Sequence, residues 1–155
     1  MVEEGNEVPE FDLVVSGGNN LKSSDLPGKL TVIFVYPKDD TSGCTKESIA
    51  FSELQDTFRE AGADIYGLSP DSLESHEKFI SKHDLKVPLL VDEEKLLIKA
   101  LGVWVEKNMY GRRYMGVDRS TFIIDKEGKV ARIWRRVKVP GHAEKVLQAV
   151  KELSE

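Results

Sequence analysis

The sequence contains a single cysteine and no long hydrophobic run, and both absences exclude classes of protein. One thiol cannot form an intramolecular disulfide, so a disulfide-stapled secreted domain is excluded and a reducing compartment, the cytoplasm by default, is expected. No apolar stretch approaches the roughly 18 residues of a membrane span. The acidic first seven residues lack the basic and apolar regions of a signal peptide. We therefore expect a soluble, uncleaved chain that binds no membrane.

Positive charge is also scarce. The chain has 22 Lys and Arg against 27 Asp and Glu, a net charge of −5, which argues against a nucleic-acid partner. Low-complexity segments, linkers and internal repeats are absent as well. One short basic cluster is predicted to be a solvated strand edge: Arg132, Arg135, Arg136 and Lys138. Because 40% of the 155 residues are hydrophobic, residues 1–155 are predicted to form one domain with a core.

Short β-branched runs alternate with longer segments of helical period, which predicts an α/β fold with a mostly parallel sheet covered by helices. The expected strands are 11–15, 30–36, 63–69, 88–91, 121–125 and 129–135. The expected helices are 44–60, 71–83, 92–101 and a last one through 146–153. The apolar run 30–36 should be central in the sheet, and the last two strands should form a tight antiparallel hairpin. Asp71 and Glu74 are predicted to form a capping box at the start of the second helix.

The lone cysteine, Cys44, follows the apolar strand 30–36 and opens the first predicted helix. A helix N-terminus presents unpaired N–H groups and about half a positive charge, so it favours an anion such as a thiolate. This position predicts a nucleophile. Position alone leaves open the alternative that Cys44 is a buried structural cysteine, which behaves as a small apolar side chain.

The residues around the cysteine resemble a known family. Pro37, Thr41 and Cys44 reproduce the P-x-x-x-T-x-x-C signature of the peroxiredoxins, and residues 36–47 (YPKDDTSGCTKE) look like the peroxiredoxin Q branch, also called bacterioferritin comigratory protein. The resemblance continues through 25–29, 102–104 and 119–125. It implies a thioredoxin-like fold with a central mixed β-sheet flanked by helices. It also implies a thiol-dependent peroxidase for hydrogen peroxide and organic hydroperoxides, with an antioxidant role and no cofactor.

The family match assigns Pro37, Thr41, Cys44 and Arg119 to the active site. A thiolate that attacks a peroxide oxygen needs donors along the O–O axis, which the Thr41 hydroxyl and the Arg119 guanidinium can supply. Pro37 would shield the sulfur, and the N–H groups of Gly43 and Cys44 would complete an anion pocket. Each residue also has a plainer interpretation: Thr41 as a helix N-cap, Arg119 as a surface ion-pair partner and Pro37 as a strand terminator.

The remaining polar and aromatic residues give weaker signals. Glu47, one turn from Cys44, is expected to pair with a basic side chain such as Arg119, since an unpaired carboxylate would disfavour the thiolate. The histidines lack metal-ligand spacing, so no metal site is expected, and all three are predicted at the surface: His76, His83 and His142. Three aromatics are predicted to pack in the interior rather than line the site entrance: Trp104, Tyr110 and Tyr114.

The absence of a second cysteine sets the expected mechanism. Many peroxiredoxin Q sequences have a resolving cysteine five residues after the first, where this chain has Ile49. The sulfenic acid of Cys44 should therefore react with an external thiol, such as thioredoxin, glutaredoxin or glutathione, or with Cys44 of a second copy. A monomer or weak homodimer is expected. A disulfide reductase would need C-x-x-C, and Glu47 occupies that position, whereas a redox sensor or holdase-like protein remains an alternative.

Overall fold

A five-stranded mixed sheet forms the centre of the protein, described here by a computed structural model for residues 2–154. The strand order is β5-β4-β3-β8-β9. These strands are β3 (Leu30–Val35), β4 (Ala63–Ser69), β5 (Leu89–Val91), β8 (Ser120–Ile124) and β9 (Val130–Trp134). β3 is central and fully buried, parallel to β4 and antiparallel to β8, which confirms the position predicted from its apolar run. β8 and β9 form the predicted antiparallel hairpin.

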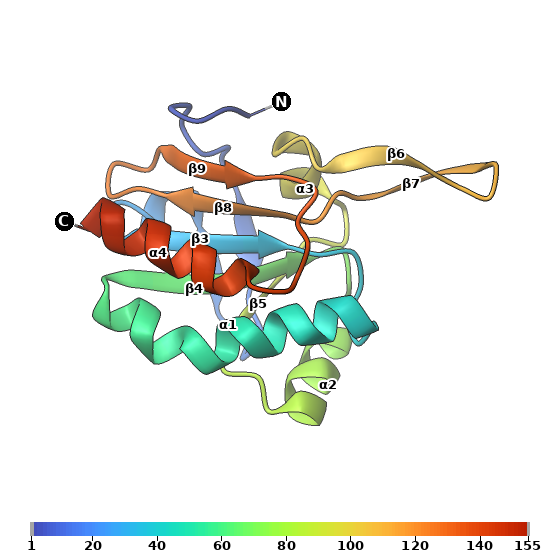
Figure 1. Ribbon diagram of the computed structural model, residues 1–155, viewed down its shortest axis with the longest axis horizontal. Helices are drawn as coiled ribbons and strands as arrows, with labels where there is room; N and C mark the ends of the chain where they lie inside the picture. The colour runs from blue at the N-terminus through green and yellow to red at the C-terminus, as the bar shows by residue number, and fades with distance from the viewer. Residues whose placement is uncertain (1, 155) are drawn as a thin grey trace.

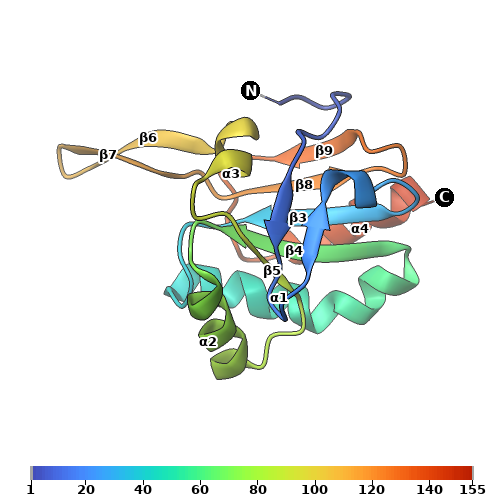
Figure 2. The same ribbon diagram turned by 180° about the vertical axis from the view of Figure 1, so that it is seen from behind.

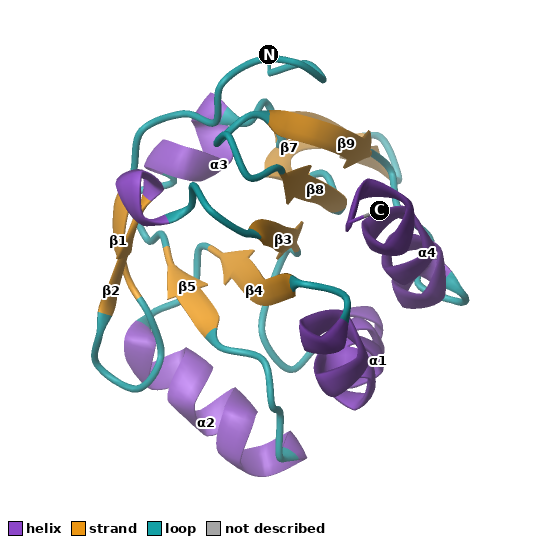
Figure 3. Ribbon diagram, turned by 90° about the vertical axis from the view of Figure 1, so that its left-hand side faces the viewer, coloured by secondary structure: helices purple, strands orange, loops and turns teal. Residues whose placement is uncertain are grey.

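Helices cover both faces of this sheet, as Figures 1 and 3 show. The helices are α1 (Ser42–Glu60), α2 (Leu73–His83), α3 (Leu96–Ala100) and α4 (His142–Ser154). Alternate residues of β3 point to opposite faces. Val32 and Phe34 pack in the core with α1, α4 and Phe79 of α2, whereas Ile33 and Val35 pack in a second core with α3. The α/β class and the thioredoxin-like, helix-flanked sheet are therefore confirmed.

Helix ends differ in detail from the sequence prediction. The capping box at Asp71 is wrong: Ser72 occupies the N-cap of α2 and its hydroxyl accepts from the Ser75 N–H at 3.1 Å. α3 is shorter than predicted, although Asp92 does accept from the backbone of Leu96 at 3.0 Å. Gly62 follows α1 with φ +91°, in the left-handed region. Glycine adopts this conformation without steric strain, and the helix ends here.

Two pairs of strands lie outside the main sheet. β1 (Asp12–Val14), which was predicted, pairs with β2 (Asn20–Lys22), which was not, and a short 3₁₀ helix, η1 (Ser23–Asp25), follows. β6 (Trp104–Met109) and β7 (Arg112–Val117) form an unpredicted antiparallel hairpin. It projects away from the body at the end of the sheet where α1 begins (Figures 1 and 2).

The hairpin overturns one prediction about aromatic packing. Tyr110 is 100% exposed at the tip, and Tyr114 is exposed as well, so neither packs in the interior. Tyr110 and Gly111 have φ +53° and +77°, and two consecutive positive values define the tight turn whose twist suits a hairpin. Only Trp104, at the base, is half-buried, with Lys95 Nζ 5.1 Å from its ring centroid.

The basic cluster on and after β9 is solvated only in part, because Arg136 and Lys138 are exposed as predicted whereas Arg132 is half-buried. Arg135 is half-buried, donates to the carbonyl oxygen of Val2 at 3.0 Å and lies over the ring of Phe122 at 5.7 Å. It therefore ties the N-terminal segment to the sheet. Within residues 2–154, no helix has the length and apolar character that a bilayer crossing requires.

Candidate active site

Cys44 lies in the first turn of α1 and is 1% exposed. Thr41 occupies the N-cap position with an extended backbone, and its carbonyl accepts from the Thr45 N–H at 2.8 Å. The N–H groups of the first turn have no partners further back along the helix, so they present partial positive charge beside the sulfur. This turn follows β3 after six residues, which places the thiol at the carboxyl end of the central strand.

Arg119 joins the thiol to a buried carboxylate. It lies between β7 and β8, and its Nη2 donates to Cys44 Sγ at 3.2 Å while Nη1 donates to Glu47 Oε1 at 2.6 Å. The side chain is 18% exposed. Burial opposes the charged form, but the charges of Glu47 and Cys44 outweigh it and raise the pKa of Arg119. A fixed cation therefore lies directly beside the sulfur.

Glu47 is 1% exposed, on the turn of α1 that follows Cys44. Burial raises its pKa to about 7, against the opposing effect of Arg119. Its second oxygen, Oε2, has no hydrogen-bond partner among the described residues. The carboxyl group can thus gain or lose a proton near neutral pH, which changes how far it neutralises Arg119. The expected contact between Glu47 and Arg119 is present.

Gly43 has no side chain, and the Arg119 guanidinium lies in the space that a side chain at this position would need. A Cβ at Gly43 would lie 3.2 Å from Arg119 Nη2, closer than most side chains tolerate. The guanidinium therefore approaches the backbone of the helix's first turn as well as the sulfur. A side chain at this position would push the guanidinium away from Cys44 Sγ.

Thr41 and Pro37 lie in the loop between β3 and α1. The Thr41 hydroxyl is exposed and donates to the Lys38 carbonyl at 2.9 Å, so in this structure its proton points away from the sulfur. Thr41 is the N-cap residue of α1, as the plainer interpretation expects, but its side chain makes no capping hydrogen bond. Pro37 is half-buried directly after β3. The structure brings Cys44, Arg119, Gly43 and Glu47 into contact, whereas Thr41 contacts the loop.

The same loop makes hydrogen bonds with a group of buried and half-buried polar residues that the sequence did not reveal as a network. The Asp39 carboxylate accepts from the Tyr36 hydroxyl at 2.5 Å and from the Ser75 hydroxyl at 2.8 Å, and it lies 2.7 Å from His76 Nδ1. The Asp39 N–H donates to Asp71 at 2.8 Å. We call these five residues, Tyr36, Asp39, Asp71, Ser75 and His76, the loop anchor.

His76 is 0% exposed, so its prediction as a surface residue is wrong. Its Nε2 lies 2.7 Å from the Leu90 carbonyl, which can only accept, so Nε2 bears a hydrogen. Its Nδ1 lies 2.7 Å from the Asp39 carboxylate, so the ring links the loop to α2 and, through the Leu90 carbonyl, to β5. Asp39, Asp71 and His76 have the atom types of a metal site within 4.8 Å of one another, but each is already hydrogen-bonded within the anchor.

The other two histidines also differ in environment. His142 is buried, contrary to prediction, and the Thr121 hydroxyl lies 2.8 Å from its Nε2. Burial lowers the pKa of His142 to about 4, so the ring is neutral at neutral pH and has one donor and one acceptor nitrogen. His83 lies at the edge of α2, with Nε2 2.7 Å from Asp40. The hydrogen bond from Lys82, and to a lesser extent the one with His83, lowers the pKa of the Asp40 carboxyl.

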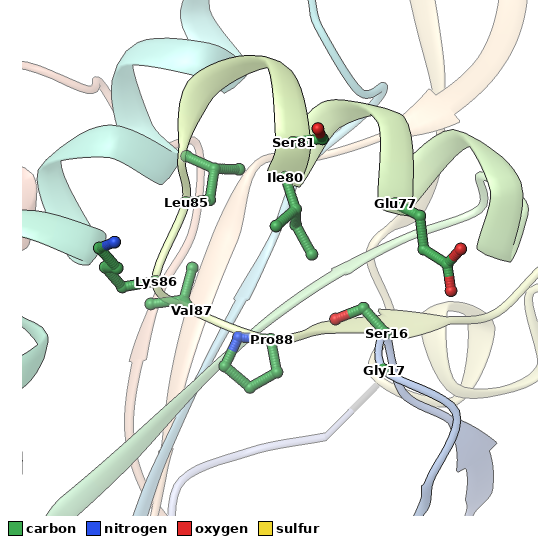
Figure 4. Close-up of a pocket in the computed structure, with 9 residues that line it drawn as sticks. All are labelled: Ser16, Gly17, Glu77, Ile80, Ser81, Leu85, Lys86, Val87 and Pro88. Carbon is green, nitrogen blue, oxygen red and sulfur yellow. The ribbon is translucent and has the colours of Figure 1, made fainter.

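A surface cavity of about 380 Å³ lies away from the thiol. Figure 4 shows Glu77, Ile80 and Ser81 of α2 across from Val87 and Pro88. Neither Cys44 nor Arg119 lines it. The candidate thiol therefore lies at a helix start and not in this hollow.

Comparisons with known proteins agree with this geometry. The profile of the AhpC/TSA family matches residues 5–133. Peroxiredoxin Bcp of Bacillus subtilis is 46% identical over 154 residues, which cover 99% of this chain and 98% of that protein. Peroxiredoxin Bcp of Xanthomonas campestris is 44% identical over 142 residues, 92% of this chain and 89% of that protein.

Solved structures give the same result. Xanthomonas campestris Peroxiredoxin Q superposes with a TM-score of 0.92 at 42% identity and covers 98% of this chain and 99% of its own. A structure of the Bacterioferritin Comigratory Protein of the same organism, reported for its alkyl peroxide reduction activity, has a TM-score of 0.92 at 41% identity and covers 99% of this chain and 100% of its own.

Proposed function

The chain belongs to the AhpC/TSA family, in its Bcp or peroxiredoxin Q group, and from this premise we propose how its single thiol works. As a member of this group, the protein is a thiol-dependent peroxidase with an antioxidant role. We propose that Cys44 reduces hydrogen peroxide and organic hydroperoxides through a sulfenic acid, which an external thiol then reduces. The observation that carries this proposal is Arg119, whose guanidinium contacts both Cys44 Sγ and Glu47.

The first step is attack of the Cys44 thiolate on one peroxide oxygen. The S–O bond forms as the O–O bond breaks, and negative charge develops on the departing oxygen, which leaves as water or an alcohol once protonated. Arg119 supports this step because it remains charged and its remaining N–H groups can donate to the peroxide. The first-turn N–H groups of Gly43 and Cys44 are proposed to complete the pocket.

Three further residues are proposed to shape the site. Glu47 orients Arg119 through the 2.6 Å contact. The exposed Thr41 hydroxyl, which donates to Lys38 in this structure, turns to donate to bound peroxide, as a freely rotating hydroxyl can. Pro37, half-buried at the end of β3, excludes water from one side of the sulfur.

The second step regenerates the thiol. An external thiol attacks the sulfenic sulfur, giving a mixed disulfide at Cys44 and water, and a second thiol then releases Cys44 as a disulfide forms between the two reductant sulfurs. Ile49 supports this course because it fills the position of the usual resolving cysteine and packs against the core. Thioredoxin, glutaredoxin and glutathione are the proposed classes of reductant.

We also propose that residues 1–155 form one domain that works in the cytoplasm as a monomer or weak homodimer. The packing of helices against both faces of one five-stranded sheet supports the single domain. The lone cysteine supports a reducing compartment.

Peroxide consumption with dithiothreitol as the reductant tests the function. The wild type is expected to consume many equivalents of hydrogen peroxide and of an organic hydroperoxide, and Cys44→Ser none, because a hydroxyl cannot replace the thiolate. One equivalent consumed per chain, with no further turnover, would instead identify a redox sensor.

A further inference from the structure

The exposed apolar side chains of this protein are concentrated on the β6–β7 hairpin. Four of the six large hydrophobic residues exposed among residues 2–154 lie between positions 109 and 115: Met109, Tyr110, Tyr114 and Met115. Within the described chain, β6 and β7 pair only with each other, so neither outer edge has a strand partner, and residues 108–115 are all exposed. Methionine, tyrosine and arginine are enriched where proteins bind one another. A surface of this kind is expected to be covered by a partner.

The two faces of the hairpin differ in charge. Residues directly opposite each other share a face, so Met109 with Arg112 and Lys107 with Tyr114 form one face, which we call the hairpin face. The hairpin face contains two cations, Lys107 and Arg112, and no carboxylate. On the opposite face, Glu106 lies 3.7 Å from Arg113 and offsets its charge.

Side chains of the hairpin face also pack against the hairpin's own backbone. A Cβ at Gly116 would lie 3.3 Å from Lys107 Cδ and 3.5 Å from Tyr114 Cε2, so the lysine stem and the tyrosine ring lie closely over this glycine. The ammonium group therefore extends beyond an apolar base. Such a surface suits a partner that offers carboxylates around an apolar patch.

The hairpin lies close in sequence to Arg119, which contacts the thiol, and at the same end of the sheet as the start of α1. Val117, the last residue of β7, precedes Arg119 by two residues, and Arg119 contacts Cys44 Sγ. The hairpin projects from the end of the sheet where α1 begins (Figures 1 and 2). A protein bound there is held at the end of the molecule where the Cys44 sulfenic acid must meet an external thiol.

We propose that the hairpin face, with Tyr110 at its tip, is the docking surface for an acidic protein thiol that reduces Cys44. This inference rests on the proposed recycling by an external thiol and adds the surface and the chemistry of the partner. In the reaction, the partner's first thiol displaces water from the sulfenic acid to form a mixed disulfide, and its second thiol releases Cys44 as the partner becomes a disulfide.

Charge complementarity favours an acidic thiol protein over a second copy of this chain and over an anionic bilayer. A symmetric second copy would place Lys107 and Arg112 against the same two cations, which is repulsive. The hairpin strands contain three cations and one carboxylate, a net charge of +2 in a chain of −5, so the rest of the chain has −7 and is repelled by an anionic bilayer.

The test measures reduction of preformed Cys44 sulfenic acid by an acidic thioredoxin, with dithiothreitol in parallel. Lys107→Glu/Arg112→Glu is expected to slow reduction by thioredoxin about tenfold or more and to leave reduction by dithiothreitol within about twofold. Lys126→Glu/Lys151→Glu makes the same charge change on exposed residues away from the hairpin and should leave both rates unchanged. The wild-type rate with thioredoxin should also fall with added salt.

A second pair of variants separates apolar contact from charge. Met109→Ser/Tyr114→Ser on the hairpin face should slow reduction by thioredoxin, whereas Met115→Ser on the opposite face should not. Equal thioredoxin rates in wild type and hairpin-face variants would overturn the proposal. So would hairpin-dependent binding to anionic vesicles, or a dimer that the Lys107→Glu/Arg112→Glu change dissociates. Absence of turnover by the wild type with dithiothreitol would instead refute the peroxidase mechanism itself.

Discussion

The loop before α1 and the β6–β7 hairpin lie at the same end of the sheet but are held in opposite ways. The loop is fixed by the buried hydrogen bonds of Asp39 and His76. The hairpin is exposed, and its strands pair only with each other in the described structure. The difference predicts that the loop leading into the candidate site depends on buried hydrogen bonds for its position, whereas the hairpin contributes little to the stability of the fold. Substitutions in the two regions should therefore have very different effects.

The largest loss of stability is expected from the loop anchor. His76→Ala should lower the free energy of unfolding by about 3 kcal/mol, because it removes the imidazole that pairs with the buried Asp39 carboxylate. Urea denaturation at pH 7 measures this loss. The exposed Lys78→Ala on the same helix is a control that should change stability by less than about 0.5 kcal/mol. Similar small losses in both variants would show that the loop is not anchored through His76.

Arg119→Ala is expected to slow peroxide attack on Cys44 by about 100-fold, the scale for removal of a preorganised donor. Stopped-flow measurement of thiol oxidation gives this rate without interference from recycling. Arg119→Lys should restore part of the rate, since it retains the charge but not the planar fork. A folded Arg119→Ala protein that reacts at the wild-type rate would reduce Arg119 to an ion-pair partner of Glu47.

Glu47 should give the protein a measurable pH dependence. Its pKa is raised from 4.5 to about 7 in the folded state by burial, so folding favours the protonated form. The associated stability is present below about pH 4.5 and is lost as the pH rises to 7 and above. Relative to Glu47→Gln, the wild type should lose about 2–3 kcal/mol between pH 5 and 8.

This comparison with Glu47→Gln also removes the contribution of His142. The lowered pKa of His142 acts with the opposite sign, since that stability is present above about pH 6.5 and is lost as the pH falls toward 4. Because His142 is present in both proteins, its effect cancels in the difference. Parallel stability profiles of wild type and Glu47→Gln would mean that burial does not shift the Glu47 pKa.

The smallest effect is expected at the hairpin tip. Tyr110→Ser should change the free energy of unfolding by less than about 0.5 kcal/mol, because the side chain is 100% exposed. Phe79→Ser, in the core beneath α2, is the contrasting variant and should be strongly destabilising. A large loss from Tyr110→Ser would indicate that the hairpin is buried in an assembly of several chains.

The sequence predicts well those features that depend on local pattern. The apolar run 30–36 and the helix that begins beside Cys44 are where they were expected. β6 and β7 were missed because they bury little and lack apolar alternation, so periodicity gives no signal. Tyr110 and Gly111, which lie between two polar runs, were the sequence signal that could have indicated the turn.

The site was predicted in part. Motif and family resemblance located Cys44 and Arg119, and the structure brings them to 3.2 Å. The loop anchor was not predicted, because Asp39 and His76 are 37 positions apart and pair only through tertiary folding. His142 was misplaced for the same reason, since a lone histidine does not reveal from local sequence that Thr121 will lie beside it.

Intact-mass spectrometry of the reduced protein after one equivalent of hydrogen peroxide, under non-reducing conditions, is the most direct test of the one-cysteine mechanism. The expected product is a monomer heavier by one oxygen atom that reacts with a sulfenic-acid trap, because Cys44 is the sole thiol in the chain. Added glutathione should convert it to a mixed disulfide. A main product that is a dimer linked through Cys44 would show that a second copy supplies the resolving thiol, and would contradict recycling by an external reductant.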